Sequence, residues 1–420
     1  MSEKEQIVEV ETLPDEILQG ATYVIQQPNP NSYTHGMFKY PCKFIPELPG
    51  WGIRTCARRE EDIVFDPFSG SGTTLLEANL RGFHACGTEI DDIAKLIIKV
   101  KTTPLNKEQM KLLDEEFQRI LDRTFRGNGM CYRPEIDNLE HWFSPEVIAE
   151  LGRMRICTET ITEQAVRDFF HLCMVSIIKK VSNADDTSPK PYVSNKVKKI
   201  PPPVEREFTS VFRRYRQMVA ELSAVEHLGT TRILAGDALD FSVPGGIGLA
   251  VTSPPYINAF DYGRTMRLEN LWLGTLTEDS LREKKKQYVG TEKINAKEED
   301  QRLDILEKSS LLKEYYGKIA VQDRKRALIV KKFFEDMETN LKAVRSQMEP
   351  GGRYMIVIGN STIRKVTVES WRVLEEIACT AGYRTWSRFS YVIQNPYIRI
   401  PRKGMGGKIG RDYVLVLERV

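Results

Sequence analysis

The tetrapeptide Ser253-Pro254-Pro255-Tyr256 combines residue types that can activate a weakly nucleophilic amine. It follows the apolar run 249–251, which predicts a buried strand with its exit loop over 249–256. Two consecutive prolines remove two N–H donors and hold the chain extended, so nearby carbonyls can face a ligand. A hydroxyl, carbonyl acceptors and an aromatic ring form a receptor for a planar amine. Acceptors from Ser253 and the Pro254 carbonyl would draw that amine toward tetrahedral geometry and free its lone pair.

A second stretch, residues 61–91, predicts a strand, a glycine turn, a helix and another strand. The turn reads DPFSGSG (66–72), the threonines at 73 and 74 are expected to cap the helix, and the second strand ends in Glu89. Glycines let backbone N–H groups approach a ligand, and an acidic residue at that strand end suits ribose hydroxyls. Leu75 replaces the third glycine of the dinucleotide motif, and no lysine completes a phosphate loop. The turn therefore favours S-adenosylmethionine as the ligand.

Together these motifs resemble those of the amino-methyltransferases that modify exocyclic amines of DNA bases with S-adenosylmethionine. DPFSGSG matches the glycine motif of that family, SPPY (253–256) matches its catalytic tetrapeptide, and Asp237 matches its third-strand acidic residue. The segment KFIPELP (43–49) resembles the helix near the methionine end of the cofactor, and a helix leading into the first strand is expected there. The resemblance covers about half of the chain, in the order cofactor half first and catalytic half second.

The resemblance implies specific roles for the site residues. Asp66 and residues 70–73 would hold the methionine moiety, Glu89 the ribose hydroxyls, and Asp237 the adenine amine. Tyr256 would stack on a base flipped out of the duplex. The implied catalytic residues are Ser253, Pro254, Pro255 and Tyr256, and the implied cofactor-binding residues are Phe44, Asp66, Phe68, Gly70, Ser71, Gly72, Thr73, Glu89, Ile90, Asp237 and Ala238.

Serine before Pro-Pro is usual for cytosine-N4 enzymes of this family, whereas Asp or Asn is usual for adenine-N6 enzymes. The sequence therefore favours site-specific methylation of cytosine N4, with adenine N6 as the alternative. An RNA guanine-N2 methyltransferase and an inactive DNA-binding subunit are further alternatives. Methylation at cytosine C5 needs a Pro-Cys nucleophile in the catalytic half, and Pro41-Cys42 precedes the cofactor motif.

Strands separated by helices predict an α/β fold, namely a doubly wound Rossmann-like methyltransferase sheet with a C-terminal antiparallel hairpin and helical insertions. We expect an N-terminal arm at 1–30 and a catalytic domain formed by 31–104, 231–264 and 349–420. Residues 105–230 form a helical and basic insertion, a candidate for DNA recognition. Apolar periodicity predicts helices in it over 107–121, 146–157 and 164–180, and Ser144-Pro145 is the expected N-cap and first residue of the second of these. Residues 265–348 form a charged helical insertion.

The basic part of the first insertion and the charged lobe at 275–345 are the candidates for gripping DNA and reading its sequence. From 179 to 216 there are ten Lys and Arg against four Asp and Glu, with Tyr192, Phe208, Phe212 and Tyr215 interleaved. Cations mixed with aromatic rings suit a phosphate backbone and stacked bases. The candidate DNA-binding residues are Lys198, Lys199, Arg213 and Arg214.

Composition sets the remaining expectations. The net charge of +3 is too small to indicate a partner, so double-stranded DNA is inferred from the motifs, and a restriction endonuclease acting on the same site is a candidate partner. The seven cysteines form no CxxC pair, which favours reduced thiols and no metal site. No apolar run of membrane-spanning length and no apolar signal core are present, so we expect a cytoplasmic protein without a membrane contact.

Overall fold

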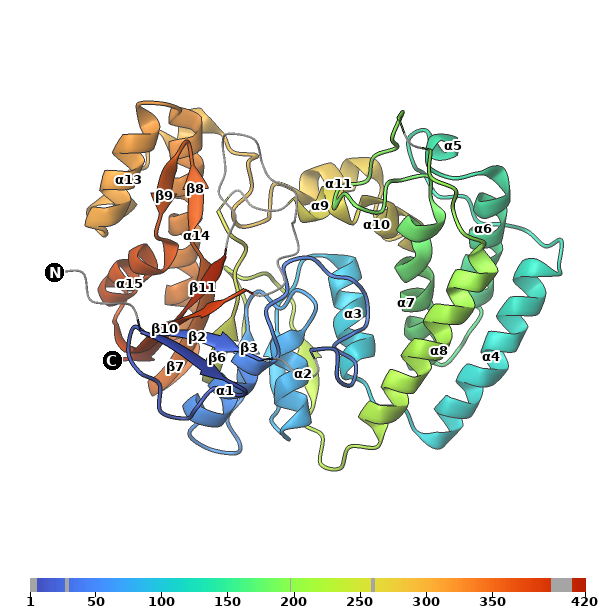
Figure 1. The fold of residues 1–420 in the computed structure, drawn as a ribbon, viewed down its shortest axis with the longest axis horizontal. Helices are drawn as coiled ribbons and strands as arrows, with labels where there is room; N and C mark the ends of the chain where they lie inside the picture. Colours follow the sequence, from blue (N-terminus) through green and yellow to red (C-terminus); the bar gives the residue numbers. More distant parts are fainter. Residues whose placement is uncertain (1–5, 27–29, 197, 258–260, 394–409) are drawn as a thin grey trace.

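A computed structural model of the 420-residue chain describes residues 6–26, 30–196, 198–257, 261–393 and 410–420. The C-terminal hairpin was expected from strands at 384–394 and 412–418 joined by a basic, glycine-rich link at 400–411. Residue 394 and residues 400–409 lie outside the described ranges. Within them, the fold is α/β, built on one large mixed sheet with helices on both faces and a separate group of helices beside it (Figure 1). The predicted fold class is confirmed.

The large sheet has nine strands among the described residues, in the order β1-β2-β10-β11-β7-β6-β3-β4-β5. Their bounds are β1 Ile7–Val10, β2 Thr22–Ile25, β3 Val64–Asp66, β4 Ala85–Gly87, β5 Thr231–Ile233, β6 Ile247–Thr252, β7 Met348–Gly359, β10 Tyr383–Val392 and β11 Arg411–Arg419. β11 is antiparallel to both β10 and β7, as the predicted C-terminal hairpin requires. A small hairpin, β8 Ser361–Ile363 with β9 Val366–Val368, was not expected from the sequence.

The strand order reverses between β3 and β6, which pair in parallel at the centre of the sheet. From β3 the chain proceeds outward to β4 and β5, and from β6 it proceeds the other way to β7. In open sheets of this kind, ligands bind beyond the carboxyl ends of the strands at that reversal. The glycine motif follows β3 and SPPY follows β6, so the topology brings the two predicted motifs together.

The N-terminal segment differs from the expected loose arm. β1 and β2 pair in parallel, and β2 continues the sheet by pairing with β10. Tyr23 and Ile25 are buried against Phe389 and Trp51, which explains why this segment is held. The surrounding charged and proline residues obscured two strands of only four residues each.

Helices cover the sheet and form a second body beside it (Figure 1). Their bounds are α1 Glu47–Cys56, α2 Thr73–Leu80, α3 Asp92–Thr102, α4 Lys107–Phe125, α5 Leu139–Trp142, α6 Pro145–Glu159, α7 Gln164–Val181, α8 Val204–Ser223, α9 Tyr262–Thr265, α10 Arg267–Leu273, α11 Glu278–Lys284, α12 Ala296–Glu299, the 3-10 helix Asp304–Glu307, α13 Ser310–Ala320, α14 Arg324–Gln347 and α15 Ser370–Thr380. α1 and α2 pack on one face of the sheet, and α14 and α15 pack on the other. We call α4 to α8 the helical lobe.

The helical lobe matches the helices predicted from apolar periodicity. α6 begins at Pro145, and the Ser144 hydroxyl accepts from the Val147 N–H, as the predicted cap requires. The lobe is joined to the sheet through α3, which contacts α7 and α10. Its continuous apolar core makes it a rigid platform beside the cofactor motifs. No helix in the described ranges is both long enough and apolar enough to cross a lipid bilayer.

Candidate functional site

A cleft opens at the carboxyl ends of the central strands. It is lined by Tyr40, Cys42, Lys43, Phe44, Pro67, Phe68, Ser69, Gly70, Ser71, Thr73, Thr88, Glu89, Ile90, Asp237, Ala238, Leu239, Ser253, Pro255, Tyr262, Gln287, Tyr288 and Val289. Nine of the eleven predicted cofactor residues are in this lining, and Asp66 and Gly72 are not. Ser253 and Pro255 from the catalytic tetrapeptide reach the same cleft, whereas Pro254 and Tyr256 do not line it.

The glycine turn is shaped by two residues with positive φ, Gly70 at 49° and Gly72 at 74°. A side chain at Gly72 would also meet Ile98 of α3 within 2.9 Å, so glycine is required there by both conformation and space. Gly72 is the N-cap of α2 and supplies no capping side chain, so the prediction that the threonines cap this helix was wrong. Thr74 instead points its hydroxyl at the Val251 carbonyl, at 3.4 Å.

Two hydroxyls on this turn have no hydrogen-bond partner among the described residues. Ser71 Oγ and Thr73 Oγ1 are buried, and both residues line the cleft. Buried hydroxyls normally find a partner, and an uncapped helix N-terminus attracts negative charge. The start of α2 is therefore prepared for the polar, anionic end of a ligand.

Glu89 lies at the opposite side of the turn, after β4. Its carboxylate accepts three backbone N–H groups, from Gly70, Ile90 and Asp91, each at 2.8 Å. Burial raises the pKa of Glu89 to about 7, although these N–H groups favour the anion. The side chain is thus held rigidly in a position where its oxygens can accept from a ligand.

Asp66 has a different place from the one predicted. It is fully buried, and its Oδ1 accepts from the Phe68 N–H at 3.0 Å and from the Thr252 hydroxyl at 2.6 Å. Burial raises the pKa of Asp66 to about 6. Because Asp66 does not line the cleft, we assign it to holding the glycine turn against β6 rather than to direct contact with a ligand.

Asp237 stands on a turn after β5 that begins with Gly236, whose φ is 93°. Asp237 Oδ1 accepts from the N–H groups of Leu239 at 2.7 Å and Asp240 at 3.1 Å, which fixes the carboxylate in the cleft wall. The turn is held from behind by Asn340 of α14, whose amide donates to the Ala238 carbonyl at 2.6 Å. The second insertion therefore supports the cofactor side of the cleft as well.

The catalytic tetrapeptide leaves β6 directly after Thr252. No residue in the described part of the chain donates a hydrogen bond to the Ser253 or Pro254 carbonyl, as expected for a backbone with two prolines. Tyr256 lies on the far side, beside the buried Asp412 of β11. Burial raises the pKa of Asp412, and the Tyr391 hydroxyl donates to its Oδ2 at 2.9 Å. Tyr256 is therefore held beside β11, directly after Pro255 of the cleft lining.

Sequence reasoning missed several residues of the cleft. Tyr40, Cys42 and Lys43 precede α1. Lys43 begins the KFIPELP motif and the other two lie just before it, which was the available signal. Tyr262 stands near the end of the expected catalytic segment 231–264, Tyr288 belongs to the second insertion, and neither carried a signal. Cys42 is notable because its early position in the chain was the reason to exclude a cysteine nucleophile. The fold nonetheless brings it to the same cleft as Ser253.

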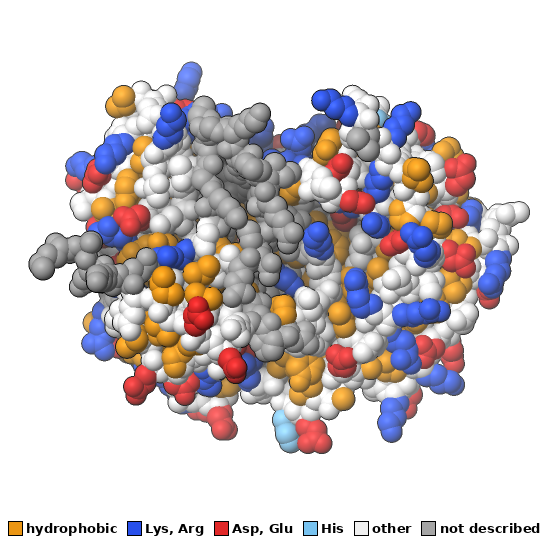
Figure 2. Space-filling model, in the orientation of Figure 1, with side chains coloured by type: hydrophobic (Ala, Val, Ile, Leu, Met, Phe, Trp, Pro, Cys, Tyr) orange, Lys and Arg blue, Asp and Glu red, His pale blue; other side chains and the backbone are white. Residues whose placement is uncertain are grey.

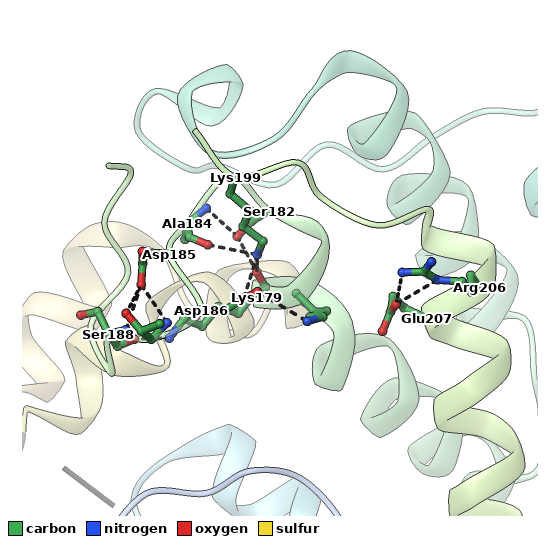
Figure 3. A network of polar contacts seen from close by, with 11 residues as sticks. Lys179, Ser182, Ala184, Asp185, Asp186, Ser188, Lys199, Arg206 and Glu207 are labelled. Carbon is green, nitrogen blue, oxygen red and sulfur yellow. Dashed lines mark hydrogen bonds and ion pairs between the residues drawn. The ribbon is translucent and has the colours of Figure 1, made fainter. Parts of the chain in front are cut away.

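The two predicted DNA-binding lysines differ in their surroundings, and Figure 3 shows the polar contacts of Lys199. Lys198 is exposed. Lys199 Nζ donates to the Lys179 carbonyl at 2.9 Å, the Ala184 carbonyl at 3.0 Å and Asp186 Oδ1 at 2.8 Å. All three ammonium donors are used, so Lys199 holds the loop between α7 and α8 and has none left for a phosphate.

Arg213 and Arg214 are exposed on α8, and no carboxylate of the described residues lies within ion-pair distance of either. The interleaved aromatic residues were misjudged: Phe208, Phe212 and Tyr215 are buried in the helical lobe, where Phe212 stacks on Phe117 at 3.9 Å. Their periodicity marked the apolar face of a helix rather than a stacking surface. Figure 2 shows basic and acidic side chains mixed over the helical lobe.

The cleft residues fit S-adenosylmethionine. The unpartnered hydroxyls of Ser71 and Thr73 and the open N-terminus of α2 suit the methionine end of that molecule. The carboxylates of Glu89 and Asp237 suit the hydroxyls and amine of its nucleoside end. Within the described residues, no group of three or more His, Cys, Asp or Glu side chains could hold a metal ion.

Residues 3–100 match the model of a protein family described as DNA methylase. The predicted resemblance to DNA amino-methyltransferases is confirmed. The "Type II methyltransferase M.MvaI" of Kocuria varians is 26% identical over 93% of this chain and 91% of its own length. The "Type II methyltransferase M.MjaII" of Methanocaldococcus jannaschii is 28% identical over 37% of this chain and 30% of its own length. S-adenosylmethionine is accordingly the methyl donor implied for the cleft.

Two solved structures align with the fold at low similarity. TrmN from Thermus thermophilus has a TM-score of 0.27 and 11% identity, covering 90% of this chain and 49% of its own. The rRNA methyltransferase aviRa from Streptomyces viridochromogenes has a TM-score of 0.30 and 11% identity, and the alignment covers 94% of this chain and 88% of its own. Both values are too low to bear on the substrate.

Proposed function

We propose that this chain methylates the exocyclic N4 amine of a cytosine flipped out of double-stranded DNA, with S-adenosylmethionine as donor. The observation that carries the proposal is that Ser253 and Pro255 line the same cleft as Glu89 and Asp237. A methyl donor held by the two carboxylates would therefore lie next to the receptor for an amine. Flipping the base costs roughly a few kcal/mol and delivers it to a site that a stacked base cannot reach.

When bound, S-adenosylmethionine supplies an electrophilic methyl group on a sulfonium. Ser253 and the Pro254 carbonyl accept the N–H groups of the base, which localises the nitrogen lone pair for in-line attack and leaves one proton to be shed. Tyr256, held beside Asp412 and next in the chain to Pro255 of the cleft lining, is the ring that we propose to stack on the flipped base. Binding the distorted amine better than the planar one lowers the barrier.

The choice of cytosine N4 over adenine N6 rests on Ser253 and is decided by the product. Purified protein is incubated with unmethylated DNA and S-adenosylmethionine, and the digested nucleosides are separated and weighed by mass spectrometry. N4-methylcytosine supports the proposal. N6-methyladenine would keep the mechanism but show that the target base is adenine. Unmodified DNA together with methylated RNA would favour a guanine-N2 enzyme.

Ser253→Ala is the matched variant for this measurement. It should lower turnover while leaving the dissociation constant for S-adenosylmethionine unchanged, because the hydroxyl acts on the base. An unreactive wild-type protein that still binds the cofactor and DNA would indicate the inactive DNA-binding subunit. Equal turnover in wild type and variant would remove Ser253 from the mechanism.

We further propose that the helical lobe and the charged second insertion hold the duplex, with Lys198, Arg213 and Arg214 contacting phosphates. The exposure of these three cations supports this assignment, and the internal hydrogen bonds of Lys199 remove it from the set. In the domain organisation that we propose, residues 31–104, 231–264 and 349–420 form the catalytic domain. Because two relatives are named Type II methyltransferases, a restriction endonuclease acting on the same site is the partner we propose.

A further inference from the structure

Three tyrosines from distant parts of the chain form one wall of the cleft. Tyr40 precedes the glycine motif, whereas Tyr262 and Tyr288 come from the second half of the chain. The rings of Tyr40 and Tyr262 are stacked with centroids 5.8 Å apart and planes 22° apart. The ring centroids of Tyr262 and Tyr288 are 6.2 Å apart, and their planes are inclined by 13°. The three rings therefore make a near-parallel row with Tyr262 in the middle.

Glu89 lines the same cleft as this row and has no cation paired with it among the described residues. Glu89 is close enough to affect the pKa of all three tyrosine hydroxyls, each of which is raised, mainly by burial. Among the described residues, no Lys, Arg or His pairs with Glu89, and its carboxylate oxygens accept only backbone N–H groups. A buried carboxylate without a cation, in a cleft that it shares with three aromatic rings, is an environment suited to a positively charged ligand group.

The row is fixed in place by the pair of aspartates that follows Glu89. The Tyr288 hydroxyl donates to Asp91 Oδ2 at 3.1 Å. One residue on, Asp92 accepts from Thr275 at 3.0 Å and pairs with Lys284 at 3.0 Å. The segment 262–288 is thus docked on the start of α3, so the rings belong to a built wall rather than to a loose loop.

We propose that Tyr40, Tyr262 and Tyr288, together with Glu89, form a receptor for the sulfonium cation of S-adenosylmethionine. The inference rests on the proposed cofactor and deepens it by naming the residues that recognise its charge. In that molecule the sulfonium is bonded to the 5′ carbon of the ribose, for which Glu89 is the candidate partner, so the rings beside Glu89 lie within reach of the sulfur. The rings attract a cation through their negative faces, and this attraction strengthens where water is excluded.

The receptor has a consequence for the product. Loss of the methyl group leaves S-adenosylhomocysteine, whose thioether sulfur is uncharged. The two molecules share the nucleoside and the amino acid, so all other contacts are the same. The tyrosine row should therefore make the protein prefer the donor over its product and favour release of the product after each transfer.

The test compares the dissociation constants of these two ligands by calorimetry in the full-length protein. Tyr262→Leu and Tyr288→Leu should weaken S-adenosylmethionine by about 5- to 30-fold and S-adenosylhomocysteine by much less. Tyr288→Phe keeps the ring and loses the bond to Asp91, so it should retain most of the preference for the donor. Tyr413→Leu is the matched control, since it removes one ring of the stacked Trp371–Tyr413 pair outside the cleft lining.

Each outcome decides the inference. Selective loss of the charged ligand supports it. Equal weakening of both ligands would mean that the rings hold a part common to the two molecules, and no change in either would remove the tyrosines from the site; both results overturn the proposal. Far-ultraviolet circular dichroism and the melting temperature identify a variant that has not folded. In that case the ligand affinities of Tyr262→Phe and Tyr262→Leu are compared at temperatures where both are folded, and this comparison decides. A wild-type protein that binds neither ligand refutes the proposed function instead.

Discussion

The hydroxyl of Thr252 donates to the carboxylate of Asp66 at 2.6 Å, and both residues are fully buried. Thr252 ends β6 directly before Ser253, for which we propose a catalytic role, and Asp66 ends β3 at the start of the glycine turn. One hydrogen bond therefore connects the strand that presents the amine receptor to the strand that presents the cofactor turn. Their relative position is set inside the sheet rather than at the surface of the cleft.

Thr252→Val should uncouple the two strand ends while keeping the shape of the side chain. The loss of a hydrogen bond to a buried carboxylate should reduce the free energy of unfolding by about 1–3 kcal/mol. Turnover should fall by more than the loss of folded protein accounts for. Urea denaturation and steady-state kinetics measure the two effects. Thr367→Val, at an exposed position of β9, is the control and should change neither quantity. Unaltered stability and turnover in Thr252→Val would show that the bond is dispensable.

Glu89 should give the free protein a pH-dependent stability. Its pKa is raised by burial to about 7 from 4.5, so the folded state binds a proton more tightly than the unfolded state. The stability that this proton supplies is complete below pH 4.5 and is lost as the pH rises through about 7. Relative to wild type, Glu89→Gln should therefore become progressively more stable as the pH is raised across this range.

Ionisation of Glu89 should also affect the affinity for the cofactor, which should increase with pH while the stability decreases. The ionised carboxylate is the better acceptor for ribose hydroxyls, so wild-type binding of S-adenosylmethionine should tighten as the pH passes through about 7. Calorimetry should show a flat profile for Glu89→Gln and weaker binding for Asp237→Ala at every pH. Identical pH profiles in wild type and Glu89→Gln would assign the titration to another group.

Adjacent lysines offer a matched test of the DNA surface. Lys198→Ala should reduce the dependence of DNA affinity on salt by about one unit of slope, because one phosphate contact is lost. Lys199→Met should leave that slope unchanged and instead reduce stability by about 1–3 kcal/mol, since three internal hydrogen bonds are removed. Fluorescence anisotropy over a salt series and urea denaturation give the two readouts. The reverse pattern would mean that Lys199 leaves its internal partners to bind DNA.

Cys42 should be dispensable for methyl transfer although it lines the cleft. Attack on the amine needs no covalent bond between protein and base, so Cys42→Ser should retain most of the turnover. DNA containing 5-fluorocytosine should form no stable adduct with the wild-type protein. A trapped adduct that disappears in Cys42→Ser would replace amine methylation with a covalent mechanism at C5.

The sequence was most informative where the chemistry depends on contiguous residues. The strand, turn and helix around residues 64–80 and the strand that ends before Ser253 follow from apolar runs, glycines and prolines. The placement of both motifs at one edge of the sheet follows from the order of parallel strands. The helices of the helical lobe follow from apolar periodicity, and the Ser144-Pro145 start of α6 follows from cap chemistry.

Contacts between distant segments could not be predicted in the same way. Tyr262 and Tyr288 reach the cleft only because Asp91 and Asp92 hold their segment, and no local pattern encodes that docking. The burial of Lys199 and of Phe212 depends on neighbours in other helices, so charge and aromatic counts misread both. Strands of four residues among charged neighbours, such as β1, are equally hidden from periodicity.

The pairing of β2 with β10 has a consequence for synthesis on the ribosome. Thr22 Oγ1 lies 2.9 Å from Ser390 Oγ, and 368 positions separate the two residues in the chain. At about 5–20 residues per second, roughly 20–70 s pass between the emergence of one strand and that of its partner. During that time β2 cannot pair with β10, and the side chains of Tyr23 and Ile25 are not yet fully buried. The nascent chain therefore exposes this apolar strand until its last strands appear.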